Sequence, residues 1–562
     1  MIEIDSSRRS QYMKILFVIP SLLLLLFTAC HQPSPPMLSR EYDTIMAREF
    51  PADGPGAVVL VAEKGQVIYR KAFGLANVEL AVPMKPENLF RIGSITKQFT
   101  ACAIMKLAEE GKLSLQDKLG KYIPDLPPSY QAIPIENLLT HTSGIKNYTD
   151  LPEWTGEFQK RDFKPAELIG WFSRQPLEFS PGEKFSYSNS GYFILGYLIE
   201  KVSGKPYGTY LEDRFFKPLG LQHTMPDNTS AIITGRAAGY QVNDSLLQNA
   251  DFLSMTQPYA AGELLSDVDD LYQWYKDVMD GKVISMESMS KAMTAYKLKN
   301  GLPVGYGYGW FLRNIQGSPT IEHSGGINGF LTCTIYLPRE DVFIALLTNS
   351  TAARPDRIAS VMAALAIHKP YEYRKFSLPY DSLPAYTGVY NSLYNGQMLV
   401  TLKDSSIYAM VRGSDRNRYI PYDHDKFYME GGFGTLTFSR DANGKVDSVV
   451  SADRNTPVAW GKTDLPMPVR KTVILPEKLL EKYLGQYKIN DKLAIRITLE
   501  KGQLFAAGSG QKKFAIYSDS EHSFYAKDID ILMEFVRVEH TGDMVMLLHQ
   551  DGKVYQGNRL PL

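Results

Sequence analysis

The feature that most constrains the fold is an internal repeat in the last third of the chain. The matches are Tyr386–Tyr390 with Tyr483–Tyr487, Phe427-Tyr428 with Phe524-Tyr525, and Phe438 with Phe535, all at an offset of 97 residues. A fixed spacing indicates copies of one structural unit. Each copy alternates short strand-like runs with turns, and has enough strands to close as a barrel. We therefore expect two small all-β, barrel-like domains at 383–465 and 475–562.

Residues 45–370 have a different texture and predict one mixed domain. The predicted elements are a hairpin over 57–70, helices over 94–110 and 191–202, strands over 305–312, 330–337 and 342–348, and a helix over 355–367. The region 113–300 is mostly helix and loop. Strands at both ends with helices between them predict an α/β (α+β) fold, in which an antiparallel sheet is flanked by helices and interrupted by a helical insertion.

The first thirty residues predict a secretory signal. Lys14 precedes an apolar run over 15–27 that is too short to span a bilayer, and small residues follow at a cut site. Cys30 directly after them resembles a bacterial lipobox, which implies lipidation of its thiol. We expect a signal at 1–30, a tether at 31–44, and a lipoprotein anchored in the membrane of a bacterial cell envelope, facing the periplasm. Ordinary cleavage and secretion is the alternative.

Composition excludes several classes of partner. The formal net charge of the 562 residues is zero and no Lys/Arg block occurs, so we expect no nucleic acid. Cys102 and Cys333 lie in a predicted helix and a predicted strand, both apolar, which predicts two buried free thiols. No CxxC or His-x-x-x-His spacing occurs, so we expect neither a metal nor a cofactor.

The pair Ser94 and Lys97 is the first candidate for chemistry. Ser-x-x-Lys occurs four times, so the pair means little alone. Ser94 follows a glycine and opens an apolar helix, where an i,i+3 spacing places both side chains on one face. A lysine has an ordinary pKa of about 10.4, which burial lowers until the neutral amine can take a serine proton.

Two further motifs support this pair. Tyr187 and Asn189 form the single Tyr-x-Asn of the chain, just before the second predicted helix. A phenol can relay a proton, and an amide can hold a substrate carbonyl. His323-Ser324-Gly325-Gly326 precedes the predicted strand 330–337, and its glycines allow a substrate backbone to lie along the sheet edge.

The order and spacing of these motifs resemble the penicillin-recognising serine hydrolases, over about 45–370. The branch most similar contains class C β-lactamases, D-alanyl-D-alanine carboxypeptidases, D-aminopeptidases and β-lactamase-like esterases (peptidase family S12). The phrases 138–144, 180–189 and 260–266 are also family-like. The resemblance implies that Ser94 is the acylated nucleophile, Lys97 its base and Tyr187 a proton shuttle. It also implies that Asn189, His323, Gly325 and Gly326 bind substrate, the N–H groups of Ser94 and Gly326 forming an oxyanion hole. The repeats resemble lipocalin-like C-terminal domains.

One departure shifts the expected substrate. Class C β-lactamases carry Lys-Thr-Gly where this chain has His323-Ser324-Gly325, and a histidine is a weaker anion site than a lysine. D-amino-acid peptides, including peptidoglycan-derived ones, or small esters are therefore favoured over β-lactams. A weak β-lactamase, a transacylase and a catalytically silent penicillin-binding envelope protein are the alternatives. The sequence leaves the oligomeric state open.

Overall fold

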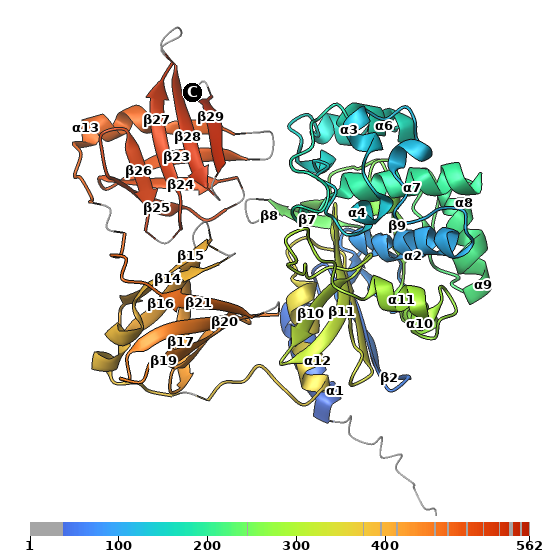
Figure 1. Cartoon of the computed structure of the whole chain (residues 1–562), viewed down its shortest axis with the longest axis horizontal. Helices are drawn as coiled ribbons and strands as arrows, with labels where there is room; N and C mark the ends of the chain where they lie inside the picture. Colours follow the sequence, from blue (N-terminus) through green and yellow to red (C-terminus); the bar gives the residue numbers. More distant parts are fainter. Residues whose placement is uncertain are drawn as a thin grey trace, which may run out of the picture.

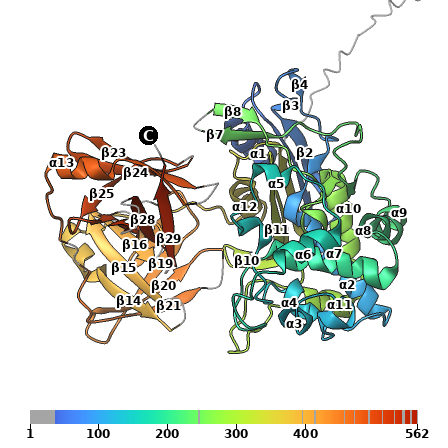
Figure 2. The same cartoon turned by 90° about the horizontal axis from the view of Figure 1, so that it is seen from above.

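The computed structural model describes residues 37–560, apart from short gaps within the chain. The gaps are 244–245, 375, 394–395, 412–413, 455–456, 469–470, 490–492, 510, 528, 539–542 and 551–552. The expected signal, the lipidation site Cys30 and residues 31–36 of the expected tether therefore lie outside the described residues. Figures 1 and 2 show a unit of helices and sheet beside two all-β units.

A six-stranded antiparallel sheet forms the centre of the first unit (Figure 1). Its strands, in spatial order, are β10 Phe311–Ile315, β11 Ser318–Ile327, β12 Phe330–Leu337, β13 Val342–Thr348, β1 Ala57–Glu63 and β2 Gln66–Phe73. β1 pairs with β13 along its whole length. A hairpin from the start of the domain thus completes a sheet built mainly from its end, which confirms the predicted architecture.

Both faces of this sheet are covered, so β1 is buried along almost its whole length instead of on alternate residues. Val58 and Leu60 lie in the core beneath the helical region, where α2 (Thr96–Glu109) and α7 (Asn189–Ser203) pack together. Val59 and Val61 lie in a second core with α1 (Met37–Glu49) and α12 (Pro355–Ala366). The period-2 alternation of a strand therefore separates two different cores.

The helical insertion confirms the expectation for the middle of the domain. Its helices are α3 Pro128–Gln131, α4 Ile135–Leu139, α5 Gly156–Gln159, α6 Pro165–Phe172, α7, α8 Tyr207–Leu211, α9 Lys217–Leu219, α10 Val268–Met279 and α11 Met286–Ala292. The short strands of this unit are β3 Leu75–Asn77, β4 Val82–Pro83, β5 Phe90–Arg91, β6 Met225–Pro226, β7 Tyr240–Asn243, β8 Leu246–Asn249 and β9 Leu264–Ser266. Gly204 ends α7 with a φ of 72°, a conformation that suits glycine.

The tether expected over 31–44 is wrong in its described part. Helix α1 begins at Met37, and the Tyr42 side chain is fully buried with its hydroxyl donating to the Met362 carbonyl of α12 at 3.2 Å. The apolar face of α1 covers the second core, so the packed domain begins before residue 45. A polar helix that docks by a few side chains resembles a linker in sequence.

The strand expected over 305–312 is also displaced. The structure has a loop over 305–310 and places β10 at Phe311–Ile315. A Cβ on Gly307 would lie 1.9 Å from the Ala292 carbonyl oxygen, and Gly309 has a φ of 87°. These glycines serve close packing against the helical region, which a regular strand does not allow.

The two repeats each close into an eight-stranded barrel, as the offset of 97 residues predicts. The first contains β14 Gly388–Ser392, β15 Gly396–Lys403, β16 Ser406–Val411, β17 Asn417–Asp423, β18 Lys426–Met429, β19 Thr435–Arg440, β20 Val446–Ala452 and β21 Val458–Lys462. The second contains β22 Gly485–Lys488, β23 Ala494–Glu500, β24 Gln503–Gly508, β25 Phe514–Ser518, β26 Ser523–Ala526, β27 Leu532–Arg537, β28 Met544–Gln550 and β29 Lys553–Arg559, with α13 Glu477–Leu480 ahead of it.

The aromatic residues that repeat in the sequence occupy the same place in the core of each barrel. Tyr386, Phe427 and Phe438 pack as a trio with ring centroids 4.9 to 5.6 Å apart. The matching trio Tyr483, Phe524 and Phe535 packs at 4.8 to 5.5 Å. The sequence repeat is therefore a repeat of one aromatic core.

The two cysteines of the described chain lie in the catalytic domain. Cys102 and Cys333 are buried free thiols, which confirms that prediction. Among the described helices, none is both long and apolar enough to cross a bilayer.

The separate cores of the barrels generate a first prediction. Because the second barrel encloses its own core, a chain that ends at Leu465 should still fold. We expect its catalytic domain and first barrel to keep the melting temperature of the full chain, measured by differential scanning calorimetry. Loss of the cooperative transition of the first two units on this truncation would contradict the assignment of independent cores.

Candidate active site

Ser94 lies in a single 3-10 turn, Gly93–Ile95, directly ahead of α2. The turn is possible because residue 93 is a glycine. Its φ is 52°, and a Cβ there would lie 2.9 Å from the backbone nitrogen of Gly326. The start of the helix thus touches strand β11, and Ser94 and Gly326 line one pocket.

Lys97 is fully buried one turn further along α2. Its Nζ lies 3.0 Å from Ser94 Oγ, 2.8 Å from Asn189 Oδ1 and 2.8 Å from the Ala261 carbonyl oxygen. All three partners are neutral, and burial lowers the pKa of Lys97 well below its ordinary value. A neutral amine has two N–H groups, which match the amide and the carbonyl oxygen. Its lone pair then faces the Ser94 hydroxyl and can accept that proton.

Tyr187 lies on the other side of Ser94, in the loop before α7. Burial raises the pKa of its phenol above the ordinary value, while a hydrogen bond with Ser94 acts in the opposite direction. The phenol is therefore protonated at neutral pH and can donate. The His141 ring packs against Tyr187, with the two ring centroids 4.1 Å apart, and its Nδ1 accepts a hydrogen bond from the Ser188 N–H at 3.1 Å. His141 therefore structures this loop.

Asn189 is the first residue of α7 and joins the two halves of the site. Its side-chain oxygen accepts from Lys97, and its backbone N–H donates to Asn147 Oδ1 at 3.0 Å. The side chain also lines the pocket that contains Ser94. Its Nδ2 amide is then the arm that can donate to a substrate carbonyl.

The structure places His323 within β11 but facing the interior, where it is 1 % exposed. Its Nδ1 donates to the Ser324 carbonyl at 2.7 Å, so Nε2 accepts from the Tyr306 hydroxyl at 3.0 Å. Burial, with Lys97 and Arg313 nearby, lowers the pKa of His323 to about 3. The ring is therefore neutral with both nitrogens occupied, and it orients β11 and Tyr306.

The edge of β11 beyond His323 is open to a ligand. Ile327 pairs with Phe330 across a two-residue turn, so the backbone groups of Ser324 and Gly326 alternate away from β12. On that side, the ladder with β10 ends at the pair Phe311 and Glu322. Gly326 and Ser324 are both exposed, whereas Gly325 is buried beneath them. An extended substrate could therefore add to this edge, with the Gly326 N–H directed at it.

The pocket over Ser94 has a volume of about 170 Å³. Its lining residues are Gly93, Ser94, Tyr148, Thr149, Trp154, Asn189, Leu253, Pro258, Ala261, Gly262, Gly326, Ile327 and Asn328. None of these side chains carries a charge. Tyr148, Trp154 and Leu253 belong to none of the motifs recognised in the sequence, and only the fold brings them to this pocket. The Ala261 carbonyl lies in the family-like phrase 260–266. Its contact with Lys97 uses the backbone, so the type of side chain at this position does not predict it.

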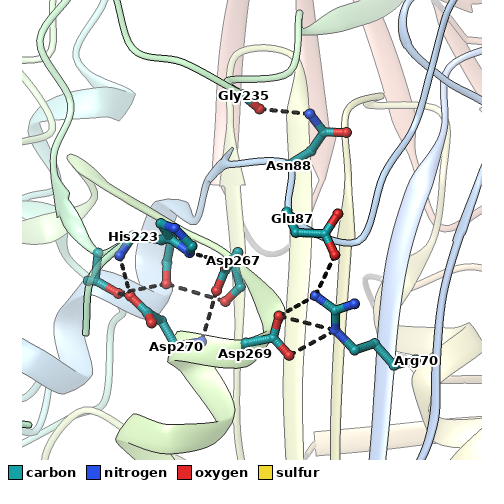
Figure 3. Close-up of polar contacts among 10 residues, drawn as sticks. Arg70, Glu87, Asn88, His223, Gly235, Asp267, Asp269 and Asp270 are labelled. Atoms are coloured by element: carbon teal, nitrogen blue, oxygen red, sulfur yellow. Dashed lines mark hydrogen bonds and ion pairs between the residues drawn. The ribbon is translucent and has the colours of Figure 1, made fainter. Parts of the chain in front are cut away.

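One cluster of acidic and imidazole groups lies elsewhere in the described part of the domain. Figure 3 shows His223, Asp267 and Asp270 directed toward one another at the start of α10. Asp267 caps this helix by accepting from the Asp270 N–H at 2.8 Å and contacts His223 Nδ1 at 2.6 Å, while Asp270 accepts from the His223 N–H at 2.7 Å. These contacts fix the helix start against residue 223, so we assign the cluster a structural role.

The buried lysine generates a pH prediction. Activity requires neutral Lys97, so kcat/KM should rise with pH through a midpoint well below about 10.4. It should stay level to about pH 10 because burial raises the pKa of Tyr187. Lys97→Arg keeps a charge that cannot be removed, and should lower kcat by about 10²–10⁴-fold. A wild-type pH profile for Lys97→Arg, measured by initial rates, would be incompatible with this role.

The two glycines of β11 provide a matched pair of variants. A Cβ on Gly325 would lie 1.9 Å from the Ile92 carbonyl oxygen, so Gly325→Ala should lower the free energy of unfolding by about 1–3 kcal/mol or more. On Gly326 the nearest atom is the flexible Leu331 Cδ2 at 3.2 Å, so Gly326→Ala should cost less than about 0.5 kcal/mol. Urea unfolding measures both. Equal losses would show that the strand does not pack as described.

Three comparisons with known proteins show the family and fold of the chain. The Beta-lactamase family profile matches residues 46–368. The chain is 27% identical over 405 residues to penicillin-binding protein 4* of Bacillus subtilis, covering 66% of this chain and 87% of that protein. The octameric penicillin-binding protein homologue from Pyrococcus abyssi is 29% identical with a TM-score of 0.53, covering 75% and 99% of the two chains. The D-stereospecific amidohydrolase from Streptomyces sp. is 26% identical with a TM-score of 0.52, covering 57% and 97%. The chain belongs to the Beta-lactamase family and is a serine hydrolase of that fold.

Proposed function

We propose that this chain cleaves uncharged carboxylic esters and amides through an acyl-enzyme on Ser94. The observation that carries the proposal is the contact of Ser94 Oγ with a buried lysine whose other two partners are neutral oxygens. That arrangement supplies a base beside a hydroxyl at neutral pH, which a surface lysine does not.

Acylation follows from the positions of these groups. Lys97 takes the Ser94 proton while Oγ attacks the substrate carbonyl carbon. The carbonyl oxygen becomes an oxyanion between the N–H groups of Ser94 and Gly326, and loss of one such donor typically costs about 3 kcal/mol. The tetrahedral intermediate then expels the leaving alcohol or amine. That group takes a proton from Tyr187, and the proton that Lys97 took from Ser94 is returned to the phenolate, so that both groups are again neutral.

Deacylation reverses the same proton movements. A water molecule enters the place of the leaving group, and as its oxygen attacks the ester carbon it gives one proton to Tyr187, which passes its own proton to Lys97. The second tetrahedral intermediate expels Ser94 Oγ, which regains a proton, and a carboxylic acid leaves. Asn189 Nδ2 would hold the acyl part of the substrate during both steps.

The charge of the pocket supports an uncharged substrate. Its lining contains aromatic and aliphatic side chains, including Tyr148, Trp154 and Leu253, and no acid or base. A free carboxylate or ammonium on the substrate would lose its hydration there without gaining a partner. His323 does not provide a cation, since its pKa of about 3 leaves the ring neutral. This favours apolar acyl groups over β-lactam carboxylates.

Peptides and amides of D-amino acids form the second candidate class. The supporting observation is the likeness to the D-stereospecific amidohydrolase from Streptomyces sp.. A transacylase would use the same acyl-enzyme with an amine in place of water. A silent penicillin-binding protein would not need the neutral lysine against Ser94, so the site favours turnover.

Export belongs to the same proposal. Lys14, the apolar run 15–27 and Cys30 support a lipoprotein signal, and hence an envelope enzyme held by a lipid with the periplasm as its compartment. Metabolic labelling of whole cells with a fatty-acid analogue, with Cys30→Ala as the control, tests this anchor.

Covalent labelling and an ester pair test the chemistry. A fluorophosphonate should add once to the wild type by intact mass and not to Ser94→Ala. An adduct that survives Ser94→Ala would remove the nucleophile assignment. A penicillin should add far more slowly.

The ester pair tests the substrate class. For two p-nitrophenyl esters of equal chain length, the butyrate should exceed the half-succinate in kcat/KM by about tenfold or more, because a buried charge loses its hydration. Addition of an amine acceptor separates hydrolysis from acyl transfer. Equal rates for the two esters would contradict the uncharged pocket.

A further inference from the structure

The first barrel reaches the catalytic domain next to the substrate edge. In both views, β20 and β21 extend from the barrel toward β10 and β11 (Figures 1 and 2). The connection between them carries Arg454, which is 7 % exposed. Its guanidinium pairs with Glu322, which is 4 % exposed and directly precedes His323 in β11. A charged side chain of the first barrel is therefore buried against the catalytic domain.

Further contacts fix this pair in place. The Arg454 carbonyl accepts from the Asn314 N–H of β10 at 2.8 Å, so the barrel also joins the edge of the central sheet. Glu322 accepts from Thr320 Oγ1 at 2.9 Å and from Arg313 Nη1 at 3.1 Å. Arg313 is the more exposed of the two arginine partners, with 30% of its side chain accessible against 9% for Arg454. Removal of Arg454 would therefore leave Glu322 with only its more exposed arginine partner.

The connection that bears Arg454 differs between the two barrels. Strand β20 ends at Ala452 and β21 begins at Val458, whereas β28 ends at Gln550 and β29 begins already at Lys553. Hairpins of a repeated domain need no such extension for their own closure. The longer connection belongs to the copy that contacts the catalytic domain, and it carries the contact residue.

The ion pair lies two contacts from the reacting groups. Glu322 pairs with Phe311 across the β10–β11 ladder. The Phe311 ring stacks on Tyr187 with a centroid distance of 6.2 Å and an interplanar angle of 9°, and lies 5.2 Å from the His323 ring. Any shift of β11 at Glu322 would therefore move Phe311 against Tyr187 and carry the Gly326 N–H with it.

We propose that Arg454 is a positioning residue, through which the first barrel holds strand β11 in the geometry that acylation of Ser94 requires. The barrel is then a working part of the site and not a spacer. This inference rests on the acyl-enzyme function proposed above.

The test compares variants in the full chain. Arg454→Met should lower kcat for the neutral ester by about tenfold to a hundredfold, because a small misplacement of reacting groups costs that much. KM should change by less than about twofold, since the pocket lining comes mainly from the helical region and binds ground state and transition state alike. Arg454→Lys, which keeps a cation, should recover much of kcat. Arg418→Met, which removes an exposed barrel arginine paired with Glu430, should match the wild type and is the control.

Several outcomes decide between positioning and mere stability. If Arg454→Met does not fold by circular dichroism, Glu322→Gln is the second variant, because it keeps the shape of the side chain and removes the charge of the pair. Wild-type kcat in whichever variant folds would overturn the inference, even with a lowered melting temperature. Stoichiometric phosphonate labelling of the wild type is measured first. Its absence would remove the proposed function itself, which is a separate result from unchanged kcat in the variants.

Discussion

Lys97 is buried against three neutral oxygens, and the rest of the site is organised by the need to keep it there. Burial removes water that would favour the ammonium form, and none of its three hydrogen-bond partners is an anion to restore it. The amine must be fixed, because a displaced lysine would reach solvent and regain its proton. Asn189 at the start of α7 and the Ala261 carbonyl do this from two different parts of the helical insertion. Burial of an amine without a counter-ion costs free energy, and the packing of the rest of the domain must offset that cost.

Strand β11 is the second constraint, because it contacts the turn that bears Ser94, the central sheet and the first barrel. On one side a Cβ on Gly325 would lie 1.9 Å from the Ile92 carbonyl oxygen, and a Cβ on Gly93 would lie 2.9 Å from the Gly326 nitrogen. On its free edge the backbone groups of Ser324 and Gly326 point away from β12, and at Glu322 it binds the first barrel. The same strand therefore links the residues next to Ser94 with the first barrel. A change in any of these contacts reaches the others through a single stiff element.

Three segments show how far a linear pattern predicts local structure in this chain. The strands 57–63, 330–337 and 342–348 are recognisable in the sequence because strands buried on both faces have nearly continuous apolar runs. The segment 37–44 resembles a tether in sequence, because the helix buries only Tyr42 and Met46 fully and therefore has a weak apolar pattern. The loop 305–310 resembles a strand in sequence, because its aromatic residues have strand propensity. The close packing of its glycines against the helical region depends on residues distant in the chain.

The sequence by itself determined the repeated barrels, the mixed catalytic domain and the identity of Ser94, Lys97, Tyr187 and Asn189 as candidates. These follow from periodicity and motif order, which are properties of the chain in one dimension. Tertiary structure alone decided that Lys97 is deprived of water, that His323 faces inward with both nitrogens occupied, and that Arg454 meets Glu322. Solvation and ion pairing depend on distances between residues far apart in the chain, so a linear pattern does not encode them directly.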